Sequence, residues 1–274
     1  MSNVLVTGAS TGIGRSIALL LAERGMTVFA GVRKDEDAEE LAETAAGDLR
    51  PLRLDVTSAA DVGEAVDQIA AAGGLKALVN NAGVYIGGPL ELMTDEDMDA
   101  TFEVNVLGLL KLTRACLPML RESLGRIVNI SSISGLVALP GVSVYAGSKH
   151  AVEAITDSLR VELSPFGIKV VAVEPGSIQT EIWRKGAERD QHRRSNSLAV
   201  RELYEPLIRL LEKLNQNPRG IPPERVAEVV HKAITADDPD NRYIVGADAK
   251  SLSLLRWLPD SLRDGAIKRR VWRR

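Results

Sequence analysis

The sequence has very little cysteine and histidine, which excludes several kinds of site. Cys116 is the one cysteine among 274 residues, so no internal disulfide can form and multi-cysteine metal motifs are excluded. Cys116 lies in an apolar helical pattern, where we expect a small core residue. The three histidines, His150, His192 and His231, are far apart in the sequence, and none belongs to a ligand-spaced motif. We therefore predict no metal site.

Long apolar runs and a large excess of charge are also absent. No apolar run approaches the ~20 residues that span a bilayer. The first residues, Met1 to Val6, contain no charged region followed by a long apolar stretch, so we expect no secretory signal and a cytoplasmic protein. The net charge of −3 gives no sign of a nucleic-acid partner. Hydrophobic residues make up 45% of the chain, enough for the core of one large α/β domain.

The first distinct pattern is a short strand, a glycine-rich turn and a helix. The strand is expected from Val4 to Thr7, and a helical apolar stripe runs from Ile17 to Ala22. Glycines allow a tight turn and close approach to a pyrophosphate, and the helix N-terminus offers free N–H groups. A turn that leads into a helix without any ligand is the alternative, but both flanks favour a phosphate site. The turn consists of Gly8, Ala9, Ser10, Thr11, Gly12, Ile13 and Gly14.

The next strand, Thr27 to Val32, carries the signal for coenzyme choice. In dinucleotide-binding folds an acidic residue near the end of this strand holds the ribose 2′-hydroxyl, whereas an arginine suits a 2′-phosphate. This strand is followed by Arg33 and Lys34, with no acid before Asp35. Charge complementarity favours NADP(H), with Arg33 as the main contact. NAD(H), with the Arg-Lys pair facing solvent at the start of the next helix, is the alternative.

Strands and helices alternate with short connections along most of the chain. This order predicts a doubly wound parallel sheet of the Rossmann type, flanked by helices, in a single domain covering residues 1–274. Ligands in such sheets bind beyond the carboxyl ends of the strands, and Gly8, Arg33, Asp55 and Asn81 all fall there. One extended nucleotide across these positions is the prediction. Further strands are expected at Leu52–Leu54, Ala77–Val79, Arg126–Ile130, Ile168–Val173 and Tyr243–Val245.

Tyr145 stands four residues before Lys149 at the head of a long helical pattern that ends at Leu163. On a helix, residues i and i+4 share one face, so the phenol and the ammonium point into the same space. A neighbouring cation lowers the pKa of a tyrosine, which makes proton transfer feasible near neutral pH. A surface tyrosine and lysine on an ordinary helix is the alternative for this pair taken alone.

Three other segments stand out. The helix expected from Thr94 to Leu107 contains Asn105 among apolar residues, where a buried amide needs hydrogen-bond partners. Residues 183–219 change in character, from charged to amphipathic, and we interpret them as a substrate lid. The tail from Leu252 to Arg274 contains leucines, tryptophans and a basic end. It would contact an anionic membrane surface or a partner subunit, or pack as a short helix with a solvated end.

Taken together, these motifs resemble the short-chain dehydrogenase/reductase family. They occur in the family's order and cover the chain up to about Thr180. The matching residues are the turn from Thr7 to Gly14; Asn80, Asn81, Ala82 and Gly83; Asn105; Ser132; Tyr145 with Lys149; and Pro175 with Gly176.

The resemblance implies a catalytic tetrad of Asn105, Ser132, Tyr145 and Lys149. Tyr145 is expected to act as general acid in reduction and as base in oxidation, and Lys149 to lower its pKa and bind the nicotinamide ribose. Ser132, preferred over the adjacent Ser131, is expected to bind the substrate oxygen, and Asn105 to hold a water. Besides the turn, Arg33, Tyr145 and Lys149, the cofactor residues implied are Asp55, Val56, Asn81, Ala82, Gly83, Pro175, Gly176, Ile178 and Thr180.

The resemblance also implies a function. We expect an NADP(H)-dependent oxidoreductase that interconverts a secondary alcohol and a ketone, or an alcohol and an aldehyde, on a lipophilic substrate, and that forms a homodimer or homotetramer. A nucleotide sensor without catalysis is the main alternative, since fold alone does not fix function. An epimerase or dehydratase is a third, although such relatives have longer C-terminal regions. An apolar pocket is expected from Leu136, Val137, Leu139, Val142, Ile182 and Trp183.

Overall fold

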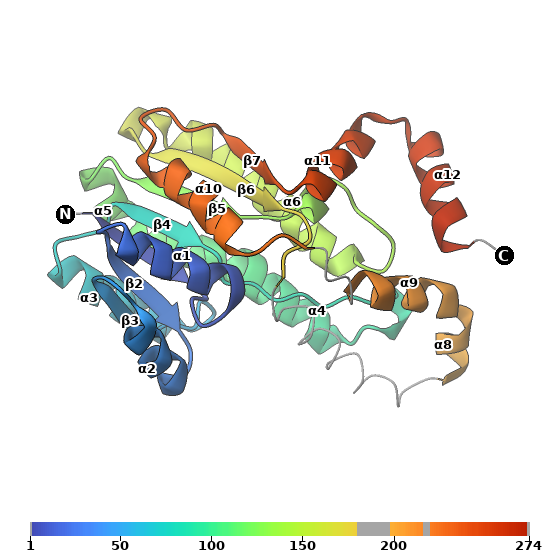
Figure 1. Cartoon of the computed structure of the whole chain (residues 1–274), viewed down its shortest axis with the longest axis horizontal. Coiled ribbons are helices and arrows are strands. Elements are labelled where there is room, and N and C mark those ends of the chain that lie inside the picture. The colour runs from blue at the N-terminus through green and yellow to red at the C-terminus, as the bar shows by residue number, and fades with distance from the viewer. Residues whose placement is uncertain (1, 180–197, 216–219, 273–274) are drawn as a thin grey trace.

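The computed structural model describes residues 2–179, 198–215 and 220–272, and these form one parallel sheet covered by helices on both faces (Figure 1). The seven strands of this part of the chain lie in the order β3-β2-β1-β4-β5-β6-β7, and every neighbouring pair is parallel. The predicted doubly wound sheet is confirmed. The strands are β1 (Asn3–Thr7), β2 (Thr27–Val32), β3 (Leu49–Arg53), β4 (Ala77–Asn80), β5 (Arg126–Ile130), β6 (Lys169–Pro175) and β7 (Arg242–Val245).

The helices fall into two layers and a C-terminal arm. α1, α2 and α10 pack on one face of the sheet, and α3 and α5 pack on the other. The helices of the main body are α1 (Gly12–Glu23), α2 (Asp35–Thr44), α3 (Ala59–Ala71), α4 (Asp95–Phe102), α5 (Leu109–Glu122), α6 (Ser143–Glu162) and α10 (Glu224–Thr235). Two further helices, α8 (Leu198–Leu203) and α9 (Glu205–Asn215), precede α10, and the arm comprises α11 (Ala247–Ser253), η5 (Leu254–Trp257) and α12 (Asp260–Val271).

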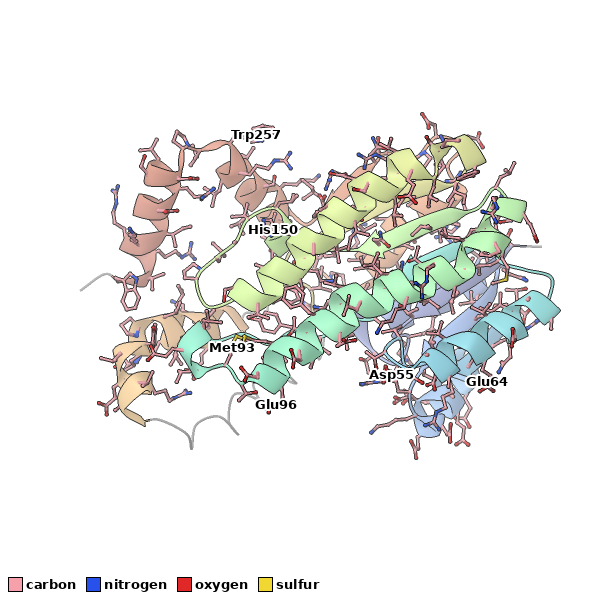
Figure 2. The ribbon with its side chains drawn as sticks, turned by 180° about the vertical axis from the view of Figure 1, so that it is seen from behind. Asp55, Glu64, Met93, Glu96, His150 and Trp257 are labelled. Atoms are coloured by element: carbon pink, nitrogen blue, oxygen red, sulfur yellow. The ribbon has the colours of Figure 1, made fainter. Side chains whose placement is uncertain are left out.

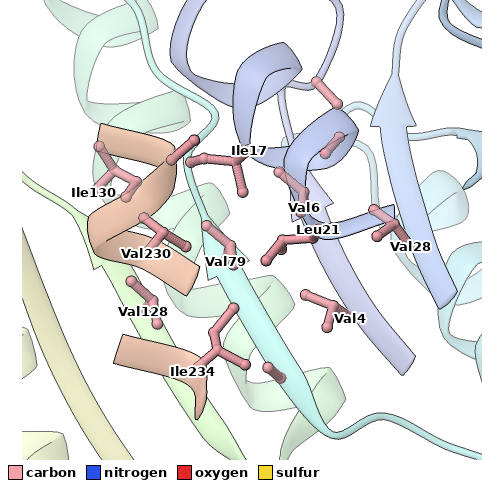
Figure 3. Packing of buried hydrophobic residues seen from close by; sticks show 14 of the residues in the cluster. Val4, Val6, Ile17, Leu21, Val28, Val79, Val128, Ile130, Val230 and Ile234 are labelled. Atoms are coloured by element: carbon pink, nitrogen blue, oxygen red, sulfur yellow. The ribbon is translucent and has the colours of Figure 1, made fainter. Parts of the chain in front are cut away.

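Alternating side chains of the central strands supply two separate cores. Val4 and Val6 of β1 face α1 and α10, while Leu5 between them faces α3 and α5. This follows from the two-residue period of a strand, and burial of both faces accounts for the nearly continuous apolar sequence. Figure 3 shows the first core, where Ile17 and Leu21 of α1 approach Val230 and Ile234 of α10 over the strands. Cys116 lies in the second core, as predicted, and burial raises the pKa of its thiol to about 12.

Two predicted element boundaries were wrong for identifiable reasons. β3 runs over Leu49–Arg53 rather than Leu52–Leu54, so it includes Pro51. A proline cannot donate a ladder hydrogen bond, but β3 is an edge strand, where a proline is tolerated. The helix expected to run from Thr94 to Leu107 is regular only over α4; it then widens into the π-helix η2 (Glu103–Gly108) before α5. Sequence periodicity does not reveal such a local widening.

All strand ends that matter for the site meet at one edge of the sheet. Because the strands are parallel, the residues after β1, β2, β4, β5 and β6 emerge on the same side. The order reverses between β1 and β4, the position where doubly wound sheets bind their ligands. Ser58 caps α3 near this edge, with its Oγ accepting from the Asp61 N–H at 3.2 Å.

Candidate active site

The turn between β1 and α1 has the backbone that a phosphate site requires. Gly8 and Gly12 have φ angles of 64° and 57°, in the left-handed region that favours glycine. A Cβ atom on Gly14 would lie 2.2 Å from the Gly8 carbonyl oxygen and 2.4 Å from Asn81 Nδ2, so no side chain fits there. Thr11, the N-cap of α1, makes no side-chain capping bond. The first turn of α1 therefore keeps N–H groups for an anion, which fits a dinucleotide pyrophosphate.

Asn81, expected along the cofactor, ties β4 to the glycine turn. Its Nδ2 donates to the carbonyl oxygens of Thr7 at 2.8 Å and Gly8 at 3.1 Å. In return, Thr7 Oγ1 accepts the N–H groups of Asn81 and Ala82, each at 2.9 Å. The Asn81 side chain thus holds the turn in shape, and the backbone of Ala82 and Gly83 continues along the strand edge.

The far end of the edge carries Arg33, expected at the ribose 2′-phosphate, and Asp55 and Val56, also expected at the cofactor. Arg33 follows β2, is exposed, and makes no hydrogen bond or ion pair with the residues that the structure describes. Asp55 follows β3, and its Oδ1 accepts from Thr57 N at 2.9 Å and Thr57 Oγ1 at 2.7 Å. Val56 is buried against Gly108. The exposed guanidinium is the one cation among these candidates that can meet a 2′-phosphate.

Tyr145 and Lys149 lie one turn apart near the start of α6, as their spacing predicts. Lys149 Nζ is 5.9 Å from the centroid of the Tyr145 ring and donates to the Ile130 carbonyl oxygen at 2.8 Å. The Tyr145 hydroxyl is hydrogen-bonded to Ser132. Tyr85 meets the Tyr145 ring edge to face, at 5.0 Å between centroids and 76° between planes. These contacts fix the phenol at the carboxyl end of β5.

The electrostatics of this pair differ from the expectation in one respect. Burial raises the pKa of Tyr145, and the hydrogen bond from Ser132 only partly opposes that. Burial also lowers the pKa of Lys149 to about 8, against the opposing charge of Glu153. The expected lowering of the Tyr145 pKa by Lys149 is therefore not seen: burial is the largest influence on the phenol, and Ser132 is the group that opposes it.

The two serines after β5, Ser131 and Ser132, differ in their contacts. Ser132 Oγ accepts from Ser134 N at 3.1 Å and lies against the Tyr145 hydroxyl. Ser131 Oγ is buried without a partner among the described residues and lies beneath Gly135. The geometry therefore favours Ser132 over Ser131 for contact with a substrate oxygen.

Asn105 lies in the π-helix η2. Its side chain is buried and hydrogen-bonded through both polar atoms, as a buried amide requires. Its Oδ1 accepts from Val84 N at 2.8 Å, and its Nδ2 donates to Val84 O and Ser148 Oγ, each at 3.0 Å. Ser148, which the sequence analysis missed, passes the connection on to the Tyr145 carbonyl oxygen at 2.7 Å. Asn105 thus locks the segment after β4 against the helix that carries Tyr145.

The loop after β6 is held by a residue that the sequence analysis also missed. Asp248, in the first turn of α11, accepts the Ser177 N–H on Oδ2 at 2.8 Å. A Cβ on Gly176 would lie 2.5 Å from Asp248 Oδ1, which explains the glycine after Pro175. Ile178 is buried beside this loop. The predicted residues Thr180, Ile182 and Trp183 lie outside the described residues.

Apolar side chains line one side of Tyr145. Leu139, Tyr145 and Leu211 pack on a buried cluster of Tyr85, Val142 and Ala146. Leu139 and Val142 were expected there, whereas Tyr85 and Leu211 were not. Leu211 belongs to α9, and a Cβ on Gly141 would lie 2.6 Å from it, so the described part of the predicted lid rests directly on this side of the site. Val137 is buried and Leu136 is half-buried nearby in the chain.

Comparison with known proteins decides the family. A family model described as short chain dehydrogenase matches residues 2–191. The chain belongs to the short-chain dehydrogenase family. It is therefore an oxidoreductase that acts on CH–OH or carbonyl groups with a nicotinamide nucleotide, as the resemblance implied.

Several curated relatives of this short-chain dehydrogenase match over nearly its whole length. It is 36% identical to the uncharacterized oxidoreductase YusZ of Bacillus subtilis, over 98% of both chains. It is 35% identical to the NADPH-dependent 3-dehydrocapnine reductase of Ornithobacterium rhinotracheale, over 96% of this chain and 95% of the relative. It is 37% identical to retinol dehydrogenase 16 of Mus musculus, over 96% of this chain and 87% of the relative.

Solved structures confirm the fold and contain both coenzymes. A short-chain dehydrogenase from Burkholderia cenocepacia in complex with NADP superimposes with a TM-score of 0.77 at 27% identity, covering 97% of each chain. One from Burkholderia phymatum in complex with NAD gives 0.81 at 25% identity, covering 96% of this chain and 95% of the other. Relatives of this fold thus bind either NADP or NAD.

Proposed function

We propose that this short-chain dehydrogenase interconverts a secondary alcohol and a ketone, or an alcohol and an aldehyde, of a lipophilic substrate with NADP(H). The observation that carries the proposal is the Tyr145 hydroxyl, bonded to Ser132 and one helical turn from the Lys149 amine. It stands on the same strand edge as the glycine turn that fits a pyrophosphate. A proton donor and a nucleotide site on one edge are the two parts that such a reaction needs.

The chemistry divides between the coenzyme and the chain. When bound, the nicotinamide supplies or accepts the hydride. In reduction, Tyr145 gives the phenolic proton to the substrate oxygen as the carbonyl carbon gains the hydride, and in oxidation it takes that proton back. Ser132 donates a hydrogen bond to the same oxygen, where negative charge develops. Lys149 places a positive charge beside the phenol and favours its ionised form. Asn105 is assigned to a water that links Lys149 to solvent.

Preference for NADP(H) rests on Arg33. It is an exposed cation directly after β2, where a 2′-phosphate lies in dinucleotide-binding folds. The relative that reduces 3-dehydrocapnine is named as NADPH-dependent, which supports the same assignment. NAD(H) is the competing coenzyme, because a structural relative binds NAD.

A lipophilic substrate is favoured by the side chains around the phenol. Tyr85, Leu139, Val142 and Leu211 are apolar or aromatic, and α9 brings the last of these onto the site as part of the proposed lid at 183–219. Relatives named for retinol and for 3-ketodihydrosphingosine act on substrates with long apolar parts. We assign the protein to the cytoplasm; no helix in the described part of the chain is long and apolar enough to cross a membrane.

The experiment is a coenzyme-coupled screen of the purified protein. NADPH oxidation and NADP reduction are followed by absorbance with steroids, retinoids, long-chain keto compounds, short aliphatic ketones and sugars. The proposal expects turnover with at least one lipophilic ketone, aldehyde or alcohol, and none with sugars. Tight NADPH binding with no turnover in any class would contradict it and favour a nucleotide sensor.

Two surfaces fit the expected partners. Phe102, Leu107 and Leu110 are exposed on the α4–α5 face beside α6, and we assign this face to a homodimer or homotetramer. Light scattering of the purified protein should give at least a dimer, and Leu107→Glu should reduce it to a monomer. A monomeric wild-type protein would contradict the assignment.

The C-terminal arm is assigned to peripheral contact with an anionic membrane surface. Figure 2 shows Trp257 on the arm, far from Asp55 at the strand edge, and Trp257 is 75% exposed. Residues 247–272 contain six basic and three acidic residues, in a chain with a net charge of −3. The protein should sediment with vesicles that contain phosphatidylglycerol but not with pure phosphatidylcholine, and Trp257→Ser should weaken that binding. Equal recovery with both vesicles would contradict the assignment.

A further inference from the structure

A buried cluster of charged side chains lies directly behind Lys149. Glu174 of β6 is fully buried and Glu153 of α6 is 6% exposed. Arg242 of β7 donates through Nη1 to Glu153 Oε2, and through the same nitrogen to Glu174 Oε1 at 2.8 Å. None of these three residues is required by the proton transfer proposed above, and buried charges are costly unless they are fully paired.

The cluster has one guanidinium for two buried carboxyl groups. Arg242 also donates through Nη2 to Asp157 at 2.6 Å, and Asp157, which is partly exposed, has Arg160 as a second partner. The remaining oxygens, Glu153 Oε1 and Glu174 Oε2, are buried with no donor among the described residues. Two ionised carboxylates cannot donate to each other, so a proton on one of them is the simplest way to satisfy both.

The surroundings indicate which carboxyl holds the proton. Burial, the charge of Glu153 and a hydrogen bond with Glu153 raise the pKa of Glu174 to about 7, although Arg242 opposes this. Gly135 packs closely against the cluster: a Cβ atom there would lie 3.0 Å from Glu153 Cγ and 2.8 Å from Ser131 Oγ. Glu174 is therefore the carboxyl that holds a proton below about pH 7, and in that form it can donate to Glu153.

Glu153 is one helical turn from Lys149 on the same face of α6. The Lys149 amine is itself buried, and its one protein hydrogen bond in the described chain is to Ile130 O. The charged and titratable groups that face this region are Tyr145 and Glu153 from α6 itself, Glu174 from β6 and Arg242 from β7; η3 (Ile133–Gly135) contributes none. Of these, Glu153 is the negative charge that opposes the loss of the Lys149 proton.

We propose that Glu153 and Glu174 form a buried carboxyl pair in which neutral Glu174 holds ionised Glu153 behind Lys149, so that Glu153 maintains the positive charge of Lys149. Both are positioning residues, because neither reaches Tyr145. The consequence for catalysis rests on the role proposed for Lys149, but the charge relation itself does not.

The direct test is the titration of the Lys149 amine. Protein labelled with ¹³Cε-lysine is titrated by NMR between pH 6 and 11, and the Lys149 signal is assigned by its loss in Lys149→Met. In Glu153→Gln the midpoint should fall by about one pH unit, because burial is then unopposed. Asp157→Asn is the matched control: it removes another carboxylate bound to Arg242, two turns from Lys149, and should leave the midpoint in place. A midpoint that moves equally in both variants, or in neither, would overturn the proposal.

A second measurement tests the neutral state of Glu174 and does not depend on the Glu153 variant. When folding raises the pKa of a carboxyl, that group lowers the free energy of unfolding as the pH increases. The loss begins at the pKa of the unfolded chain, about 4.3, and is complete above the pKa of the folded protein. Glu174→Gln keeps a neutral donor and removes that cost. The melting temperature of the variant minus that of the wild type should therefore increase from pH 5 to pH 8. A difference that does not vary with pH would show that Glu174 is ionised in the folded protein and would overturn the proposal.

The NMR titration and the melting-temperature series both use the protein without substrate. Their outcomes are therefore independent of the proposed function. If Tyr145→Phe retained activity while the Lys149 midpoint shifted as expected, only the catalytic assignment would fail. If Tyr145→Phe were inactive and the midpoint did not move, only the carboxyl pair would fail.

Discussion

The strand edge that carries Tyr145 and the C-terminal arm differ in how their side chains are paired. On the edge, Asn81, Asn105 and Lys149 each bond to the backbone of a neighbouring segment, and the shortest such bond of each is 2.8 Å. On the arm, Leu254, Trp257 and Leu262 are 61–75% exposed. Groups held by fixed backbone partners keep one geometry for chemistry, whereas exposed apolar groups are available to bind something else.

This difference separates two tasks. We assign nucleotide binding and proton transfer to the edge, and its residues are recognisable in the sequence. The proposed lid and the arm follow β6 and β7, and the family model ends at residue 191, before most of the proposed lid and before the arm. We expect substitutions on the edge to impair chemistry or coenzyme binding, and substitutions in the lid to change substrate affinity. The predictions below follow that division, from the largest effect to the smallest.

Removal of the phenolic hydroxyl should have the largest effect. Tyr145→Phe should lower kcat by about 10²–10⁴-fold, since general acid catalysis contributes that much, while NADPH binding is kept. Steady-state kinetics and fluorescence titration with NADPH measure the two quantities. Tyr243→Phe is the matched control, because that hydroxyl accepts from Asp240 N on the exposed side of β7. Wild-type turnover in Tyr145→Phe would mean that another group transfers the proton.

Gly14→Ala should weaken NADPH binding by about two orders of magnitude. The added methyl would meet the Gly8 carbonyl oxygen and Asn81 Nδ2, so the glycine turn must shift away from the shape that accepts a pyrophosphate. Isothermal titration calorimetry with NADPH and a melting curve measure binding and folding separately. Gly63→Ala is the control, since nothing lies within 4 Å of a Cβ there and alanine favours a helix. Unchanged affinity in Gly14→Ala would contradict the site.

Arg33→Ala should weaken NADPH by roughly tenfold or more and leave NADH nearly unchanged, because one charge-assisted contact to the 2′-phosphate is worth about 1.5–3 kcal/mol. The ratio of kcat/KM for the two coenzymes is the readout. Lys34→Ala, an exposed neighbour, should change that ratio much less. An equal loss for both coenzymes in Arg33→Ala would remove the basis for NADP(H) preference.

Leu211→Ala should have the smallest effect of the four. Truncation of a half-buried leucine that packs on Tyr85 and Val142 should raise KM for a lipophilic substrate several-fold with kcat nearly kept. Leu203→Ala, on the 69% exposed leucine of α8, is the control and should leave KM unchanged. A fall in kcat with unchanged KM would place Leu211 among the groups that position the reaction.

The sequence predicted the strand edge well because local patterns specify it. Gly8, Gly12 and Gly14 mark a turn, and the spacing of Tyr145 and Lys149 marks one helical face, so both follow from neighbours in the chain. The sequence failed where contacts join distant segments. Asp248 binds Ser177, which lies 71 residues earlier in the chain, and Leu211 of α9 packs against Gly141. Neither contact leaves a local signal in the sequence. The π-helix at Asn105 was missed because its widening arises from packing rather than from composition.

The measurement that tests the central claim most directly is a crystal structure with NADP⁺ bound. The account predicts the pyrophosphate at the N-terminus of α1 beside Gly12 and Gly14, the 2′-phosphate on Arg33, and the nicotinamide beside the hydroxyl of Tyr145. A nucleotide bound away from this edge, or a Tyr145 hydroxyl turned away from the nicotinamide, would contradict it.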